Sequence, residues 1–267
     1  VYKRQSLYGD LDVSTIRTMP PGRSETRTLA IPLDSGSDAA VDRRIANEVA
    51  EGRQVFVVCP LVEDSDKLDA ASAVAEHRRL RAEHPDLRIG LLHGQMSSDD
   101  KAEVMELVRV GDIDVLAATT VIEVGIDVPN ATLMVIRNAE RFGLSQLHQL
   151  RGRVGRGRHG GTCLLVSDAS NEDAERRIEA MVASTDGFEL AEVDLEIRGH
   201  GTLFGSSQSG MGDLRIGSVI HDRALIEAAA ACASEAVQAD RNSPFVRELV
   251  EEFRIFLGDR ASWLDRS

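Results

Sequence analysis

The sequence predicts an α/β fold, in which a parallel sheet carries helices on both faces and a mostly helical region follows. Between residues 28 and 168, short apolar runs alternate with amphipathic stretches, which is typical of parallel strands joined by helices. The run from Val55 to Cys59 is continuously apolar, as a strand buried on both faces requires. Beyond residue 168 the sequence becomes polar and amphipathic and then rich in glycine, which indicates a second region at 169–267.

Each expected strand is a short apolar run, and each expected helix has helical spacing of its apolar residues. Strands are expected at 28–33, 54–59, 88–92, 113–118, 132–136 and 162–166. Helices are expected at 39–51, 68–83 and 98–110, and after the sheet at 171–184, 188–197, 221–238 and 244–257. Ser97 and the acids that follow it favour a helix start there, because serine caps free N–H groups and acids complement the helix dipole.

Composition sets the broad class of the protein. The chain has 267 residues, of which 42% are hydrophobic and 28% charged, as in ordinary soluble proteins with room for two structural units. No apolar run approaches the length of a membrane span, and the N-terminus lacks a signal-peptide core. Cys59, Cys163 and Cys232 are far apart and in no metal-ligand spacing. We therefore expect neither a disulfide framework nor a metal site, and a cytoplasmic location.

The segment before the first strand is expected to be a connector. Pro20-Pro-Gly22 is a breaker cluster that neither a helix nor a central strand would carry. Residues 1–5 match nothing that follows, and we read them as foreign to the rest of the chain, which begins without Met. Residues 1–27 are assigned to this connector.

The stretch from Gln146 to Gly157 carries the strongest chemical signal. Residues 141–161 contain five arginines, two histidines and no acid, although the whole chain has a net charge of -13. A local cationic cluster on an acidic chain is an electrostatic focus. Arginine binds phosphate in a fixed forked geometry, and neighbouring glycines let a large anion approach the backbone. A nucleotide polyphosphate is therefore the best candidate ligand, and a solvated basic surface is the alternative.

The pattern Q-x-x-G-R-x-G-R from Gln149 to Arg156 resembles the signature of superfamily-2 helicases. The resemblance implies that residues 28–168 are the second RecA-like domain of such a motor. It makes Arg153 and Arg156 the catalytic, phosphate-facing arginines and Gln149 an ATP contact. The chain has no G-x-x-x-x-G-K-[ST] phosphate loop and no D-E-x-H-type strand end. We therefore expect Mg²⁺ to be held mainly by a first motor lobe that this chain lacks, and the chain alone not to hydrolyse ATP.

Two further motifs follow predicted strands, at the carboxyl edge where parallel sheets bind ligands. His93 and Gly94 form a turn that leads into a helix N-terminus, whose N–H groups attract phosphate. The same turn in superfamily-2 helicases contacts the translocating strand, which implies that His93 and Gly94 bind DNA. A structural histidine is the alternative.

The stretch from Thr119 to Pro129 follows another predicted strand. It resembles motif V of the same helicases, which implies that the hydroxyls of Thr119 and Thr120 hold a DNA phosphate. Gly125 and Asp127 would then belong to the ATP site, with the Asp127 carboxylate accepting hydrogen bonds from a ribose or an arginine. Capping of the strand end is the alternative role.

The family is indicated by residues 186–210. The sequence from Asp194 to Gly199, together with Gln208-Ser-Gly210, resembles the "translocation in RecG" motif, which RecG-like helicases share with the transcription-repair coupling factor. In that family a helical hairpin and loop couple ATP-driven domain motion to movement along double-stranded DNA. The resemblance therefore gives Arg198, Gly199 and Gln208 a coupling role, on a loop expected to begin at residue 198. Pairing of Arg198 with a nearby acid is the alternative.

The sequence departs from the family pattern at four places. His200 stands where the family usually has Pro, Thr202 where it usually has Glu, and Ser207 where a basic residue is common. Arg137-Asn138 replaces a more usual acidic pair. Other stretches, at 8–13, 20–23 and 59–64, resemble RecG-like helicases rather than the coupling factor.

The resemblance implies an ATP-dependent branched-DNA helicase and double-stranded DNA translocase. Such an enzyme acts in fork reversal and Holliday junction migration, for DNA repair and recombination. Its partners would be ATP, forks and junctions, and we expect a monomer. Two alternatives remain at this point: a translocase of the coupling-factor type, and a non-catalytic module that binds nucleotide or nucleic acid.

Overall fold

The computed structural model describes residues 26–34, 36–60, 66–119, 128–168, 171–202 and 223–257. Nearly all of the expected connector lies outside these ranges, as do Thr120, Gly125, Asp127 and Gln208. The described residues fall into two compact units. The first contains the sheet and continues to Gly199, and the second contains the last two helices.

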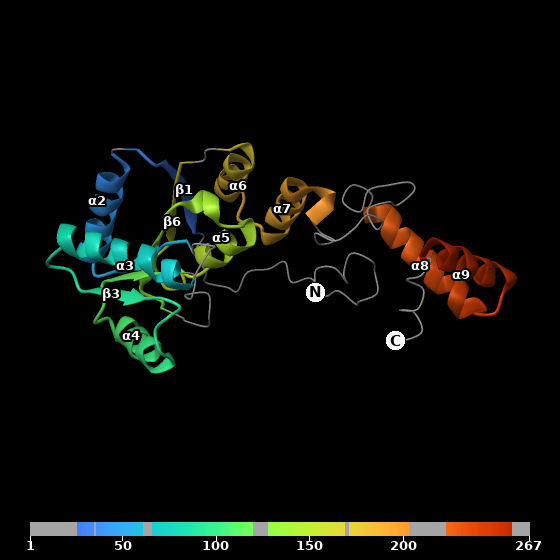
Figure 1. Ribbon diagram of the computed structural model, residues 1–267, viewed down its shortest axis with the longest axis horizontal. Coiled ribbons are helices and arrows are strands. Elements are labelled where there is room, and N and C mark those ends of the chain that lie inside the picture. Colours follow the sequence, from blue (N-terminus) through green and yellow to red (C-terminus); the bar gives the residue numbers. More distant parts are fainter. Residues whose placement is uncertain are drawn as a thin grey trace. The chain divides into compact units, whose positions relative to one another are not determined.

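Six parallel strands form one sheet in the first unit, in the order β1-β6-β5-β2-β4-β3 (Figure 1). The strands β2, β4 and β5 at its centre are buried at every residue, which is why the sequence requires uninterrupted apolar runs there. The predicted parallel sheet is therefore confirmed. The strand bounds are β1 (Arg27–Pro32), β2 (Gln54–Val58), β3 (Ile89–Leu92), β4 (Val115–Ala118), β5 (Ala131–Ile136) and β6 (Thr162–Ser167).

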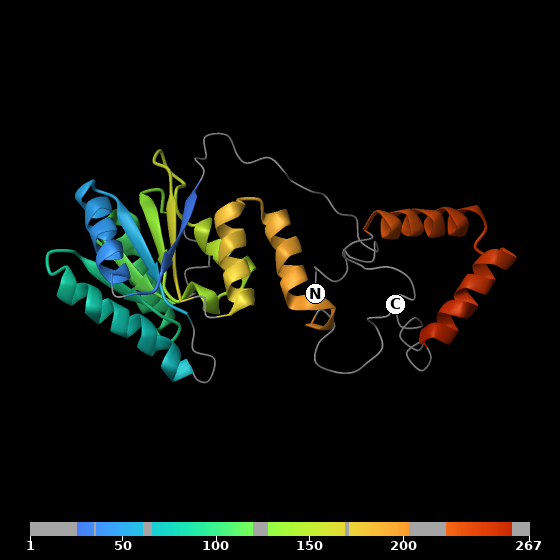
Figure 2. The ribbon, with the colours of Figure 1, turned by 90° about the horizontal axis from the view of Figure 1, so that it is seen from above.

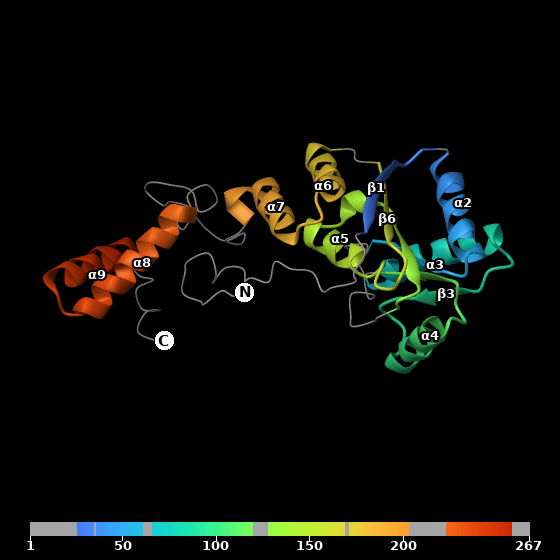
Figure 3. The ribbon, with the colours of Figure 1, turned by 180° about the vertical axis from the view of Figure 1, so that it is seen from behind.

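Helices cover both faces of the sheet (Figure 2). The helices α2 (Ser37–Ala50) and α3 (Asp66–Glu83) pack on one face, where Ile45 and Leu80 join a buried apolar cluster. The other face is covered by α4 (Ser98–Val110), α5 (Leu144–Arg151), α6 (Glu172–Ala183) and α7 (Gly187–Thr202), and its cluster includes Leu147, Met181 and Leu190. A 3-10 turn, η3 (Ala139–Arg141), precedes α5. The α5 and α6 helices lie side by side (Figure 3).

The α7 helix differs from the prediction at its C-terminal end. It continues through Arg198 and Gly199 to Thr202, whereas the sequence predicts a loop from residue 198. A glycine inside a helix costs only about 1 kcal/mol relative to alanine, so glycines alone do not end it. Proline would break the helix, but His200 stands at the position where proline is usual in the family.

The α6 and α7 helices belong to the sheet-containing unit. Ile178, Met181 and Leu190 are buried in the same apolar cluster as the strands. The sequence becomes polar and amphipathic after residue 168, but this change does not mark the end of the packed unit. An amphipathic helix has one apolar stripe, and that stripe can pack on a sheet as well as on another helix.

The second unit contains α8 (Arg223–Ala239) and α9 (Pro244–Leu257). Ser243 caps α9, because its hydroxyl oxygen accepts a hydrogen bond from the N–H of Val246 at 3.2 Å. Pro244 follows at the first helical position, where its missing N–H is not needed.

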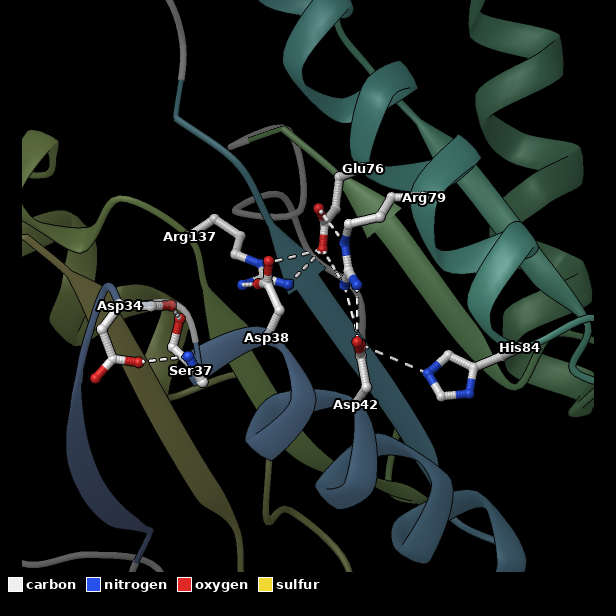
Figure 4. A network of polar contacts seen from close by, with 9 residues as sticks. Asp34, Ser37, Asp38, Asp42, Glu76, Arg79, His84 and Arg137 are labelled. Carbon is white, nitrogen blue, oxygen red and sulfur yellow. Dashed lines mark hydrogen bonds and ion pairs between the residues drawn. The ribbon is translucent and has the colours of Figure 1, made fainter.

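A polar network joins α2 and α3 at the carboxyl edge of the sheet (Figure 4). Arg137 directly follows β5, and its guanidinium is nearly buried. Its Nη1 donates to Asp38 Oδ1 of α2 at 2.6 Å, and its Nε donates to Glu76 Oε1 of α3 at 3.0 Å. An acid at position 137, as is more usual in the family, would instead meet two carboxylates.

Arg79 extends the network along α3. It donates to both carboxylate oxygens of Asp42, at 2.8 and 3.0 Å, and also to Glu76. Burial alone would lower the pKa of Arg79, but the hydrogen bonds to Glu76 and Asp42 raise it, so the arginine stays charged. His84 Nε2 lies 3.5 Å from Asp42 Oδ1. The network therefore ties the two helices of this face together by charge as well as by apolar contacts.

We expect Arg137→Met to destabilise the fold, because Asp38 and Glu76 lose their shared cation. The free energy of unfolding should fall by about 2 kcal/mol. Breaking a fully buried ion pair costs about 3 to 5 kcal/mol, and the cost is smaller here because Asp38 is exposed. Urea unfolding measures this value. The control is Arg109→Met, which breaks an exposed pair with Glu106 and should leave the midpoint of urea unfolding nearly unchanged. Equal losses in both variants would contradict the role of the network.

Candidate nucleotide and DNA sites

The residues singled out in the sequence lie at two opposite edges of the sheet. His93 and Gly94 follow β3 and Thr119 follows β4, so all three lie at the carboxyl edge, as predicted. The arginine loop (residues 152–161) lies at the amino edge, because Gly155 N donates to the carbonyl of Ala131, where β5 begins. A strand rises about 3.3 Å per residue, so the two edges are separated by roughly 13 to 20 Å. The motifs therefore form two separate candidate sites.

The arginine loop is held in its tight path by glycines. Gly155 has a φ of 70°, and a Cβ there would lie 2.6 Å from the backbone N of Gly161. A Cβ on Gly157 would lie 2.3 Å from the carbonyl oxygen of Pro129. Both positions require glycine, because backbone atoms fill the space of a side chain and Gly155 also needs a positive φ.

Arg153 and Arg156 lie on either side of Val154, which is fully buried and anchors the loop in the core. Both arginines are half-buried, and Nε of Arg156 donates to the carbonyl of Gly152 at 2.9 Å. Gln149 is exposed on α5, one turn before the loop. The three described residues predicted to contact nucleotide thus lie near the end of α5 and in the loop that follows it. Since no acid occurs between residues 141 and 161, the group can attract an anion.

Arg151 belongs to the same basic stretch but faces the interior. Arg151 is only 4% exposed, and its Nη1 donates to the carbonyls of Met181 and Ser184 at 3.0 and 2.8 Å. Burial lowers the pKa of its guanidinium. Sequence reasoning missed this role, because position 151 is one of the open positions of the motif and nothing local separates a buried arginine from an exposed one.

At the carboxyl edge, His93 and Gly94 form a compact turn before α4. His93 N lies 3.4 Å from Met96 Sδ, and Nδ1 of the ring is buried without a hydrogen-bond partner in the described structure. Gly94 is exposed, and a Cβ there would meet nothing within 4 Å. Lys101 Nζ donates to the Gly94 carbonyl at 2.7 Å and so brings a cation to the turn. Lys101 is not among the residues predicted from the sequence to bind DNA.

Thr119 is fully buried, and its hydroxyl has no hydrogen-bond partner in the part of the chain that the structure describes. Its N–H donates to the carbonyl of Leu92 at 3.1 Å, which fixes the end of β4 against β3. A direct contact between this hydroxyl and DNA would therefore require the atoms that cover it to move. Thr120, Gly125 and Asp127 lie outside the described residues.

The predicted coupling residues Arg198 and Gly199 lie in the last turns of α7, and Gln208 lies outside the described residues. Glu196 is an acid close to Arg198 in sequence, and its carboxylate lies 3.8 Å from Arg176 of α6. That carboxylate therefore already has a basic neighbour.

No group of three metal-ligating side chains comes together among the described residues. Within the same ranges, no helix is both long and apolar enough to cross a membrane.

We expect Gly155→Ala to destabilise the chain by about 1 to 3 kcal/mol, because an L-residue is strained at this positive φ and its Cβ would overlap Gly161. Thermal unfolding measures the loss. Gly94→Ala is the matched control, since its Cβ would enter open space. The interpretation fails if the two variants unfold at the same temperature.

Two family models match the chain. One is described as "Helicase conserved C-terminal domain" and matches residues 38–158. The other is described as "ATP-dependent DNA helicase RecG, domain 3, C-terminal" and matches residues 184–250. The first match contains both predicted sites, and the second contains α7 and α8.

Curated relatives and a solved structure agree with these models. The ATP-dependent DNA helicase RecG of Synechocystis sp. is 44% identical over 95% of this chain and 31% of its own length. The corresponding protein of Thermotoga maritima is 47% identical over 83% of this chain and 28% of its own length. A structure described as "Structure of RecG bound to three-way DNA junction" has a TM-score of 0.64 at 41% identity, covering 85% of this chain and 29% of that chain.

The chain thus spans about a third of the length of these curated relatives. The sheet has the RecA-like helicase fold that the arginine motif implies, and the region after it matches the family model of the C-terminal part of RecG domain 3. The chain belongs to the RecG family of ATP-dependent DNA helicases.

Proposed function

We propose that this chain is the C-terminal motor lobe of an ATP-dependent branched-DNA helicase that translocates on double-stranded DNA. The enzyme would act in fork reversal and Holliday junction migration during DNA repair and recombination. The main supporting observation is the pair of half-buried arginines, Arg153 and Arg156, on a glycine-constrained loop without acids. The similar RecG structure is described as bound to a three-way DNA junction, which supports branched DNA as the partner.

The amino edge is the proposed ATP site. ATP supplies the phosphoryl group whose transfer drives the motor. Arg153 and Arg156 would stabilise the negative charge that develops on that group, as arginine fingers do in other nucleotide hydrolases. Gln149 would contact the nucleotide from the end of α5, and Gly125 and Asp127 are proposed for the same site. Mg²⁺ is proposed to be held mainly outside this chain, by side chains of another lobe.

The carboxyl edge is the proposed DNA site, with His93, Gly94, Thr119 and Thr120 as its contacts. Asp99 and Asp100 already complement the dipole at the start of α4, so the helix N-terminus alone attracts an anion weakly. The open backbone at Gly94 and the nearby Lys101 cation favour a phosphate at the turn instead.

The remaining proposals concern coupling and setting. Arg198, Gly199 and Gln208 would couple lobe movement to translocation, and the active form would be a monomer. We propose a cytoplasmic location, because Cys59 and Cys163 are free and buried thiols. Burial raises the pKa of each of these thiols to about 12, so both stay protonated. A reducing compartment keeps such cysteines unpaired.

In the full-length enzyme, we expect Arg156→Ala or Arg153→Ala to lower ATP turnover by about 10³-fold or more, as the loss of a finger arginine does. The affinity for junction DNA should change little, since these arginines and the His93–Gly94 turn lie at opposite edges of the sheet. Phosphate release and a junction-binding titration measure the two effects.

Arg158→Ala is the control for the arginine variants. Arg158 is exposed in the same loop, two residues beyond the motif, and its replacement should leave most of the ATP turnover. If Arg153→Ala or Arg156→Ala bound junctions poorly yet hydrolysed ATP normally, the ligand assigned to the amino edge would be wrong.

A further inference from the structure

A buried polar contact joins α5 to the turn between α6 and α7. This α6–α7 turn comprises residues 184–186, and α7 begins directly after it at Gly187. The contact lies between the proposed ATP site, which follows α5, and the helix that carries the proposed coupling residues. No residue assigned to catalysis or to DNA binding takes part in it.

Arg151 provides the main part of this contact. The last four carbonyls of a helix have no partner within the helix and carry partial negative charge. Arg151 Nη1 donates to one such carbonyl, that of Met181, and to the carbonyl of Ser184, the first residue after α6. The same Nη1 lies 3.3 Å from the Thr28 hydroxyl of β1. A cation that is 4% exposed is therefore held by one strand and one helix end.

His148, one turn earlier on α5, adds a second contact. Its Nδ1 lies 2.9 Å from Nη2 of Arg151, and it must accept this hydrogen bond because arginine has no acceptor. The ring lies against Gly187, where a Cβ would be only 3.0 Å from Nε2. The first residue of α7 is therefore packed directly on α5.

The α6–α7 turn is itself constrained by hydrogen bonds. The Ser184 hydroxyl donates to the Glu189 carboxylate at 2.6 Å and accepts from Asp186 N at 3.0 Å. Asp186 Oδ1 accepts from Phe188 N at 2.7 Å. Because these bonds tie the turn to the first turn of α7, a displacement of α5 would carry the start of α7 with it.

We propose that Arg151 is a positioning residue that transmits movement of the arginine loop to α7. The inference rests on the proposed function. Arg151 is the last residue of α5, and Arg153 follows it by two positions. Arg198 lies roughly 16 Å further along α7 than Gly187, at 1.5 Å per residue, so a small rotation at the turn becomes a larger displacement there.

The test uses the full-length enzyme with Arg151→Met, which keeps the length of the side chain but removes its donors. DNA-stimulated ATP hydrolysis should persist, while the number of base pairs unwound per ATP should fall about tenfold, as expected for a broken coupling between sites. Arg151→Lys should restore only part of the base pairs unwound per ATP, because one ammonium cannot replace both Nη1, which binds the two carbonyls, and Nη2, which binds the His148 ring.

The matched control is Thr28→Val. It removes the bond of Arg151 to β1 but leaves the carbonyls of Met181 and Ser184 bound, so it should lower stability without changing the base pairs unwound per ATP. If Arg151→Met fails to fold, Gly187→Ala disturbs the same contact from the other side, by pushing on the His148 ring, and should lower the same ratio.

Two results would overturn the inference, and they are distinguishable. An active wild-type enzyme whose ratio is unchanged in folded Arg151→Met or Gly187→Ala shows that Arg151 only stabilises the fold. A wild-type enzyme without DNA-stimulated ATP hydrolysis overturns the proposed function and, with it, this inference.

Discussion

Burial of the central strands on both faces is the constraint on which the arrangement of the sites depends. Every residue of β2, β4 and β5 is buried, so no side chain of these strands can meet a ligand. Functional groups are confined to the strand ends and to the loops that continue from them. The His93–Gly94 turn thus lies at one edge of the sheet and the arginine loop at the other. Helices on both faces leave these edges as the open parts of the domain.

The sequence predicts most of the elements because burial leaves a direct signature. The apolar runs locate the strands to within two residues, and Ser97 marks the start of α4, where its hydroxyl accepts from Asp100 N. Two features could not be predicted. The α7 helix extends through Gly199 because no proline interrupts it there, and the spacing of the glycines alone does not reveal this extension. The burial of Arg151 depends on where α6 ends in space, and no pattern within α5 encodes that.

Charge in this protein is used in two different ways. The arginines of the motif are half-buried beside constrained glycines and far in sequence from any acid, which suits the attraction of an anion. Arg79 and Arg137 are instead surrounded by carboxylates, and Arg151 by carbonyls and a hydroxyl. Arginine content therefore says little about function here. Burial also differs, because Arg137 and Arg151 are buried whereas Arg153 and Arg156 are half-buried.

The separation of the two proposed sites has a thermodynamic consequence. Two ligands bound at opposite edges of one buried sheet share no side chain and cannot exclude each other by occupying the same space. Any influence between them is a coupling free energy carried by the packed elements, and such coupling is reciprocal. If DNA at the His93–Gly94 turn strengthens nucleotide binding at the arginine loop by some factor, nucleotide must strengthen DNA binding by the same factor. By the same rule, a lower affinity for DNA when product nucleotide is bound and a lower affinity for product nucleotide when DNA is bound would be two measurements of one coupling free energy.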